Sequence, residues 1–178
     1  MKKITTPITK AKISKLNAGD EILLTGTIYT GRDQAHKRMT SMIKQGKNLP
    51  IDLKGQIIYY CGPTAAPRGK VIGSCGPTTS SRMDNLTEPL FKKGLLGMIG
   101  KGRRSVEVRN LIKKYKGIYF VAPSGCGALL AKKVIANDVV CFRELGPESI
   151  CELHVENFPL IVGIDSKGNS IYKNLCQF

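Results

Sequence analysis

The chain has 178 residues, 42% of them hydrophobic, and its 28 Lys and Arg residues outnumber 13 Asp and Glu residues for a formal net charge of +15. This length and composition are typical of a globular protein, and we expect residues 1–178 to form a single domain. No run of about 18 apolar residues occurs, and the first residues lack the apolar stretch of a signal peptide, so we expect a cytoplasmic protein with no membrane span.

The first half of the chain is predicted to begin with strands and then to alternate strands with helices. Strands are expected at residues 2–11 and 20–29, and Gly26 indicates a bulge in the second. A helix should begin near Arg32, because the apolar residues that follow recur at helical spacing. The apolar run at residues 56–61 is typical of a strand that is covered on both faces.

The second half continues this alternation and ends in consecutive strands. Helices are expected at residues 83–93, 106–116 and 128–135, and strands at 95–99, 118–121, 139–142, 150–155, 160–164 and 171–172. Because strands alternate with helices and also follow one another at each end, the pattern favours a three-layer sheet/sheet/helix domain over a doubly wound one.

The positive charge has three possible meanings. It can attract nucleic acid, an anionic substrate, or an acidic protein partner. The basic residues are spread along the chain and no aromatic-rich strip accompanies them, so we do not expect nucleic-acid binding.

The cysteines give no sign of a disulfide framework or a metal site. They are scattered, no Cys-x-x-Cys pair is present, and the only histidines are His36 and His154. In a cytoplasmic chain this spacing is typical of reduced thiols. We therefore expect no metal site built from this chain alone. The cysteines are Cys61, Cys75, Cys126, Cys141, Cys151 and Cys176.

Residues 73–84 have the composition of an anion-binding turn. They read Gly-Ser-Cys-Gly-Pro-Thr-Thr-Ser-Ser-Arg-Met-Asp. Glycine lets the backbone approach a ligand, a helix N-terminus favours negative charge, and an arginine fork fits a carboxylate. The alternative is that the hydroxyl residues only cap the following helix. The candidate ligand residues are Thr78, Thr79, Ser80, Ser81 and Arg82.

Two further positions are candidates for the same site. Arg32 would place a cation at a helix N-terminus, which is unfavourable by up to about 1 kcal/mol, whereas Asp33 is favourable there. A residue that breaks a local rule is a functional candidate. His36 lies one turn after Arg32, and either a site role or a structural role is open to it. Lys101 stands between two glycines at a strand end, as a turn residue or an anion contact.

Four motifs in this order resemble one enzyme family. They are Thr30-Gly31-Arg32-Asp33-x-x-His36, Tyr60-Cys61-Gly62-Pro63, residues 73–84 and Gly100-Lys101-Gly102. Across residues 4–172 the chain resembles the β subunit, or C-terminal domain, of class I iron-sulfur fumarate hydratases and L(+)-tartrate dehydratases. The resemblance implies an α/β swivelling β/β/α domain, with a mixed sheet and flanking helices. It also implies a hetero-oligomer in which an α subunit holds a 4Fe-4S cluster on three cysteines, while this chain binds none.

The resemblance also implies roles for individual residues. Thr78, Arg82, Arg32 and Lys101 would contact a dicarboxylate, with Thr79, Ser80 and Ser81 beside them in the same motif. The reaction would be reversible addition of water across a carbon-carbon double bond, with the cluster's open iron acting as a Lewis acid. Thr78 would be the base, although a threonine hydroxyl needs nearby cations to become one; Asp33 or His36 acting through water is the alternative.

Three functions therefore compete. The first is hydration of fumarate to (S)-malate by an enzyme that is active only with its α subunit. The second is dehydration of L(+)-tartrate to oxaloacetate, in the same type of complex. The third is a basic binding module that has the fold without catalysis.

Overall fold

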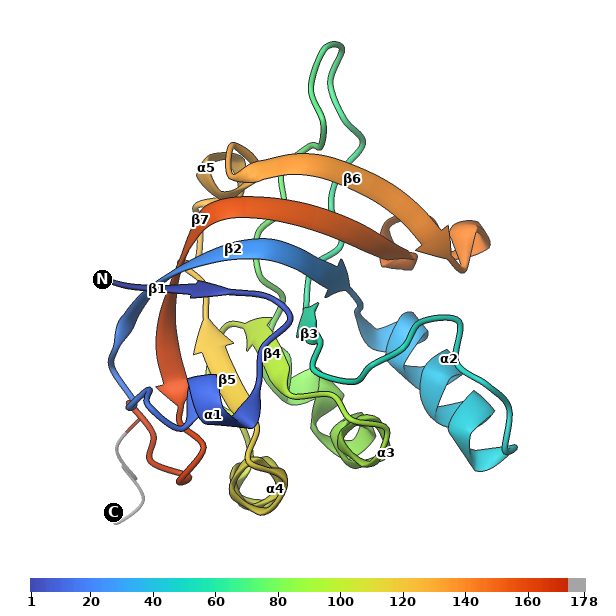
Figure 1. Cartoon of the computed structure of the whole chain (residues 1–178). Helices are drawn as coiled ribbons and strands as arrows, with labels where there is room; N and C mark the ends of the chain where they lie inside the picture. The colour runs from blue at the N-terminus through green and yellow to red at the C-terminus, as the bar shows by residue number, and fades with distance from the viewer. Residues whose placement is uncertain (173–178) are drawn as a thin grey trace, which may run out of the picture.

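The computed structural model describes residues 1–172 and shows a mixed α/β fold in three layers (Figure 1). The strands are β1 (Lys2–Thr5), β2 (Glu21–Thr30), β3 (Ile57–Tyr59), β4 (Gly97–Gly100), β5 (Ile118–Val121), β6 (Val134–Cys141) and β7 (Ile150–Ile164). The helices are α1 (Lys10–Ile13), α2 (Asp33–Lys44), α3 (Thr87–Lys92), α4 (Val106–Tyr115) and α5 (Gly127–Ala131), with 3₁₀ segments η1 (Ser80–Leu86) and η2 (Arg143–Glu148).

The seven strands form one mixed sheet that curls on itself. Their order is β1-β2-β3-β4-β5-β7-β6. An additional pairing between β2 and β7 closes β2, β3, β4, β5 and β7 into a barrel-like ring. Strands β2, β3, β4 and β5 run parallel. Their carboxyl ends therefore meet at one edge, which is where α/β sheets bind ligands.

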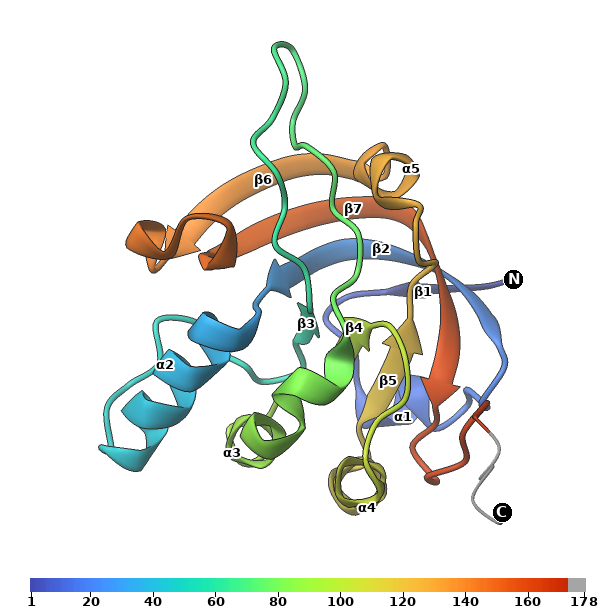
Figure 2. The ribbon, with the colours of Figure 1, turned by 180° about the vertical axis from the view of Figure 1, so that it is seen from behind.

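Two hydrophobic cores lie on the two faces of the parallel strands. Ile57 and Tyr59 of β3 point into the core inside the ring, whereas Ile58 and Tyr60 point into the core under the helices. Figure 2 shows α2, α3 and α4 together on that outer side of the sheet. The prediction of a strand buried on both faces is confirmed, as is the β/β/α class of the fold.

Several other predictions are confirmed with small changes at the ends. The strand at residues 118–121 and the helices that begin near Arg32 and at Val106 are present. The bulge at Gly26 is also present: the β2–β7 register shifts between Leu24 and Gly26, where the backbone has a φ of 116° that suits glycine.

Near the N-terminus, the predicted strand at residues 2–11 is too long. It ends at Thr5, because Pro7 has no N–H for the ladder, and the short helix α1 follows. Thr9 caps α1 by accepting a hydrogen bond from the Lys12 N–H. The predicted helix at residues 83–93 begins earlier, as the 3₁₀ segment η1, and continues as α3.

Near the C-terminus, several predicted elements are wrong in length or type. The helix predicted at residues 128–135 ends at Ala131, because the β-branched Val134 pairs with Val155 and begins β6. The strands predicted at 150–155 and 160–164 are one continuous strand, β7, which pairs along β2. No strand forms at residues 171–172; only an isolated bridge between Ile164 and Ser170 precedes them.

Candidate functional site

Arg32, Thr78 and Lys101 lie at the carboxyl edge of the parallel strands. Arg32 follows β2 and Lys101 follows β4. The end of β3 joins them: the Gly31 N–H donates to the Tyr59 carbonyl at 3.0 Å, and the Thr78 N–H donates to the Tyr60 carbonyl at 2.7 Å. Three segments that are distant in sequence are thus hydrogen-bonded around one strand end.

The hydroxyl motif is bonded directly to the loop that carries Lys101. Thr79 and Lys101 form an isolated parallel bridge. The Ser80 N–H donates to the Lys101 carbonyl at 3.1 Å, and the Lys101 N–H donates to the Ser80 hydroxyl at 3.1 Å. Arg82 comes two residues after Ser80, in the first turn of η1, so its backbone lies close to Lys101.

Asp33 brings the two predicted arginines together. Its carboxylate accepts two hydrogen bonds from Arg82, one of them from Nε at 2.9 Å, and its Oδ2 lies 3.7 Å from Arg32 Nε. Burial opposes ionisation of Asp33, but the hydrogen bonds from Arg82, a backbone hydrogen bond and the positive charges of Arg82 and Arg32 together outweigh it, so the pKa of Asp33 is lowered. Arg32 also faces Glu148 at 3.7 Å. The cation at the start of α2 is therefore balanced by two carboxylates.

Glu148 is a residue of this site that the sequence did not indicate. It lies in η2, and one of its oxygens accepts a hydrogen bond from the Gln34 N–H at 2.7 Å while the other faces Arg32. This carboxylate therefore holds the N-terminal turn of α2 in place. No local pattern reveals the contact, because more than a hundred residues separate Glu148 from Arg32.

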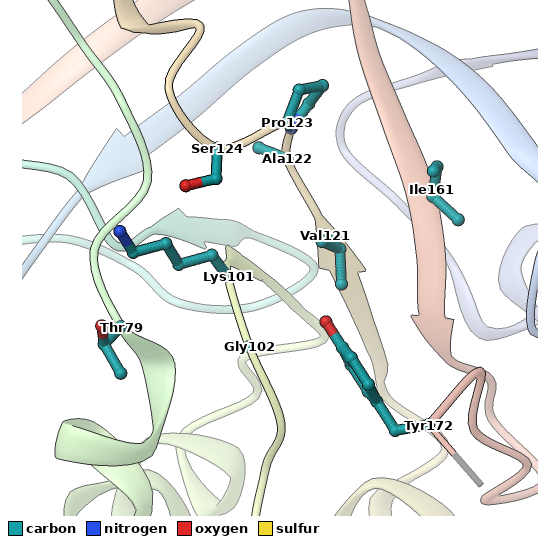
Figure 3. A pocket seen from close by; sticks show the side chains of 9 residues that line it. All are labelled: Thr79, Lys101, Gly102, Val121, Ala122, Pro123, Ser124, Ile161 and Tyr172. Atoms are coloured by element: carbon teal, nitrogen blue, oxygen red, sulfur yellow. The ribbon is translucent and has the colours of Figure 1, made fainter.

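A pocket of about 460 Å³ opens beside Lys101. In Figure 3 the Lys101 side chain extends between Thr79 and Ser124. Ser124 follows β5, so β2, β4 and β5 are each followed by a polar residue at this edge, and Thr78 is hydrogen-bonded at the end of β3. The full lining is Thr79, Lys101, Gly102, Val121, Ala122, Pro123, Ser124, Ile161 and Tyr172. A cation with hydroxyl groups on an apolar wall is a suitable environment for a small organic acid.

His36 lies behind the site rather than in it. Its ring is fully buried, Nδ1 donates to the Arg32 carbonyl at 2.9 Å, and the ring packs edge-on against Tyr60 at 5.2 Å. Burial lowers the pKa of His36 to about 4, so the imidazole is neutral at pH 7. The ring supports the backbone of Arg32, and the catalytic role suggested for it stays a prediction.

The hydroxyl residues of the motif differ in their surroundings. Thr78 is partly buried, Thr79 and Ser81 are exposed, and Ser80 is buried. The Ser80 hydroxyl bonds to the Tyr119 hydroxyl at 2.9 Å and to the Lys101 N–H. Thr79 makes no capping bond to η1, so helix capping does not explain its presence. The predicted ligand roles of these residues stay predictions.

Arg104 is a buried cation that the sequence did not indicate. Its side chain is 0% exposed, and Nε donates to Asp84 at 2.6 Å. The guanidinium lies 5.3 Å from the ring centres of both Tyr60 and Tyr119. Asp84 also accepts a hydrogen bond from the Ser105 N–H at 2.8 Å. Since Tyr60, Tyr119 and Asp84 each touch a segment of the site, this network holds those segments together.

We expect Arg104→Met to destabilise the protein by about 3–5 kcal/mol, because it leaves the Asp84 carboxylate buried without its partner. The measurement is the free energy of unfolding in urea. The control is Arg103→Met at the exposed neighbouring position, where we expect a change below about 1 kcal/mol. Equal losses in the two variants would show that the Arg104–Asp84 pair has no special role.

The described cysteines do not fit an iron-sulfur cluster. Cys61, Cys75 and Cys151 are buried, and Cys126 and Cys141 are partly buried; Cys176 lies outside the described residues. Within residues 1–172, no three His, Cys, Asp or Glu side chains are grouped so as to hold a metal ion.

In the same part of the chain, no helix has the length and apolarity needed to cross a membrane.

Comparison with known proteins identifies the family. Residues 2–175 match the family model described as Fumarase C-terminus. The chain is 44% identical to a Methanocaldococcus jannaschii protein with the provisional name L(+)-tartrate dehydratase subunit beta, over 94% of this chain and 89% of that one. It is 37% identical to the L(+)-tartrate dehydratase subunit beta of Escherichia coli, over 96% and 87%.

Longer relatives contain the same region. The chain is 38% identical to the anaerobic class I fumarate hydratase of Escherichia coli, over 93% of this chain and 30% of the enzyme. It thus spans nearly the whole length of the tartrate dehydratase beta subunits but less than a third of the fumarate hydratase. The chain belongs to the fumarase C-terminus family.

Proposed function

We propose that this chain is the β subunit of a cytoplasmic iron-sulfur hydro-lyase that interconverts fumarate and (S)-malate. The observation that supports the proposal is that Arg32 and Arg82 share the Asp33 carboxylate, while the segment that carries Thr78 and Arg82 is hydrogen-bonded to the Lys101 loop and to the end of β3, in a chain of this family. The described cysteines do not fit a cluster, so the proposal assigns the 4Fe-4S cluster to an α subunit.

The charges at this edge support a substrate with two carboxylates. Arg82 uses Nε and one terminal nitrogen on Asp33, which fixes the plane of its guanidinium and leaves the other terminal nitrogen for a ligand. Lys101 lies beside the pocket as a second, independent cation. Two cationic groups on different segments can bind the two ends of a C4 diacid and hold its central carbons in one orientation.

Thr78 is the proposed base for the proton on carbon. In the dehydration direction, the C–H proton passes to the Thr78 alkoxide oxygen as the double bond forms and the hydroxyl leaves the neighbouring carbon as hydroxide. Return of that proton from Thr78 Oγ to the hydroxide gives water and restores the alkoxide. Nearby cations favour the alkoxide form of Thr78. The alternatives are weak bases at pH 7: the pKa of His36 is about 4 and that of Asp33 is lowered.

L(+)-tartrate is the second candidate substrate. Its support is that two of the similar proteins carry the name tartrate dehydratase subunit beta and match this chain over nearly their full lengths. The reaction would again remove one proton from carbon and one hydroxyl, to give oxaloacetate after tautomerisation. The same cations would bind both carboxylates, so the site as described suits either acid.

The test is anaerobic reconstitution of the chain with its α subunit. We expect the complex to interconvert fumarate and (S)-malate, and each subunit alone to be inactive. Turnover of L(+)-tartrate without turnover of fumarate would select the second substrate. If neither acid reacts, and the chain instead binds nucleic acid with an affinity that falls steeply with salt, the chain is a basic binding module and the proposal is wrong.

A further inference from the structure

An exposed arm, residues 64–74, projects from the molecule beyond β6 (Figures 1 and 2). At its base, the Thr64 N–H donates to the Ser74 carbonyl at 3.0 Å and the Ser74 N–H donates to the Thr64 hydroxyl at 2.9 Å. At its tip, the Lys70 N–H donates to the Pro67 carbonyl at 3.0 Å. Residues 64–71 are exposed, so the arm presents most of its length to solvent or to a partner.

A groove of about 480 Å³ separates the arm from α5 and the start of β6. The segments that form the groove also carry exposed apolar side chains: Val71 on the arm is 46% exposed, Leu129 on α5 is 60% and Ile135 on β6 is 50%. Clusters of exposed apolar residues of this kind mark interaction surfaces. The lining of the groove includes Val71, Ile72, Ala128, Ala131 and Val134.

The charged residues of the arm and of the α5 segment are all basic. Arg68 and Lys70 lie on the arm, and Lys132 and Lys133 follow α5; all four are exposed. Residues 62–83 and 122–137 contain no Asp or Glu. A surface that is both apolar and basic is complementary to one that is apolar and acidic.

The arm leads directly into the candidate site. The chain enters it from Tyr60 and leaves it toward Thr78, and these two residues are hydrogen-bonded to each other. At the base, the Cys75 N–H donates to the Gly127 carbonyl at 3.2 Å. A Cβ on Gly127 would lie 2.9 Å from the Gly76 nitrogen, so only glycine permits this close contact of the arm's base with α5. A protein that binds the arm and α5 is therefore placed next to the site.

We propose that the arm and α5 are the docking surface for the α subunit, and that they bind an acidic, apolar surface of it. This inference rests on the proposed function, which supplies the partner. A second copy of this chain would bring the same four cations against each other and is disfavoured by repulsion. Nucleic acid is disfavoured because the arm has no aromatic residue for stacking and its groove is lined by apolar side chains.

The test of the charges uses two double variants. Arg68→Glu with Lys70→Glu alters the arm, whereas Lys44→Glu with Lys47→Glu alters exposed residues at the far end of α2 by the same net charge. Binding to the α subunit is measured anaerobically by calorimetric titration at two salt concentrations. We expect the dissociation constant to rise at least about tenfold for the arm variant and to stay within about twofold for the control. The affinity of the arm variant should also depend less on salt.

The test of the apolar contacts uses two single variants. Leu129→Ser alters an exposed position of α5, the helix that lines the groove through Ala128 and Ala131, and Val106→Ser alters α4 at a similarly exposed position, 66% against 60%. We expect Leu129→Ser to weaken binding about tenfold and Val106→Ser to leave it unchanged. If the arm and α5 variants bind the α subunit as tightly as their controls, the docking surface lies elsewhere.

The outcomes separate this inference from the proposed function. If all variants assemble normally into an active hydro-lyase, the proposed function stands and the docking surface is wrong. If the α subunit binds through the arm but no acid reacts, the docking surface stands and the proposed function is wrong. Self-association of this chain that the arm variant abolishes would make the surface a contact between two copies and overturn the inference.

Discussion

Arg82→Ala lowers kcat/KM of the reconstituted complex for (S)-malate by about 10²–10³-fold. This loss corresponds to about 2.7–4.1 kcal/mol, because each 1.36 kcal/mol is a factor of ten, and it lies within the about 2–5 kcal/mol that truncating one partner of a hydrogen-bonded charge pair costs. The loss has two sources: the substrate carboxylate loses the terminal nitrogen of Arg82 that is not used on Asp33, and the Asp33 carboxylate loses its bidentate partner and repels the substrate. Steady-state rates under anaerobic conditions measure the effect, and circular dichroism checks that the fold is kept.

The matched control for this prediction is Arg38→Ala. Arg38 lies in α2 and, like Arg82, forms an ion pair, in its case with Glu144; its side chain is 40% exposed against 48% for Arg82. Because it lies away from the sheet edge, we expect kcat/KM within about twofold of the unchanged protein. Arg82→Lys keeps the charge but not the fork, and should recover only part of the lost activity. Near-normal rates for Arg82→Ala would remove this residue from the site.

Thr78→Val lowers kcat by about 10²–10⁴-fold, the range of general acid–base catalysis, while KM changes little. Valine has nearly the same shape as threonine, and the Thr78 backbone bond to Tyr60 does not depend on the side chain, so the segment stays in place. Thr78→Ser keeps a hydroxyl and should lose no more than about tenfold. The measurement is kcat for (S)-malate dehydration, together with binding of a non-reacting C4 diacid to the complex.

An active Thr78→Val complex would transfer the base role to another group. Asp33→Asn and His36→Gln then decide between the two alternatives, since only the true base loses kcat with KM kept. A Thr78→Val variant that no longer binds the diacid would assign Thr78 to substrate binding instead of proton transfer. The Asp33 variant also loosens Arg82, so it is interpreted together with Arg82→Ala.

The carboxyl-edge location of the site was predictable from residue order. Arg32 follows the β2 pattern, Lys101 follows the β4 pattern, and the hydroxyl motif comes between them in sequence. Parallel strands place their carboxyl ends together, so residues at those ends meet without further information. The interactions of their side chains were not predictable in this way: Asp33 and Arg82 are 49 residues apart, and no periodicity connects them.

The amino-acid sequence by itself determined the local elements and their burial, because side-chain periodicity and β-branching act over a few residues. The β3 run, the strand at Ile118–Val121 and the helix from Val106 are examples. Only the tertiary structure decided the closure of the ring between β2 and β7, the burial of Arg104 with Asp84, and the projection of the arm. These depend on contacts between residues far apart in the chain, whose energies exist only once the segments have packed together.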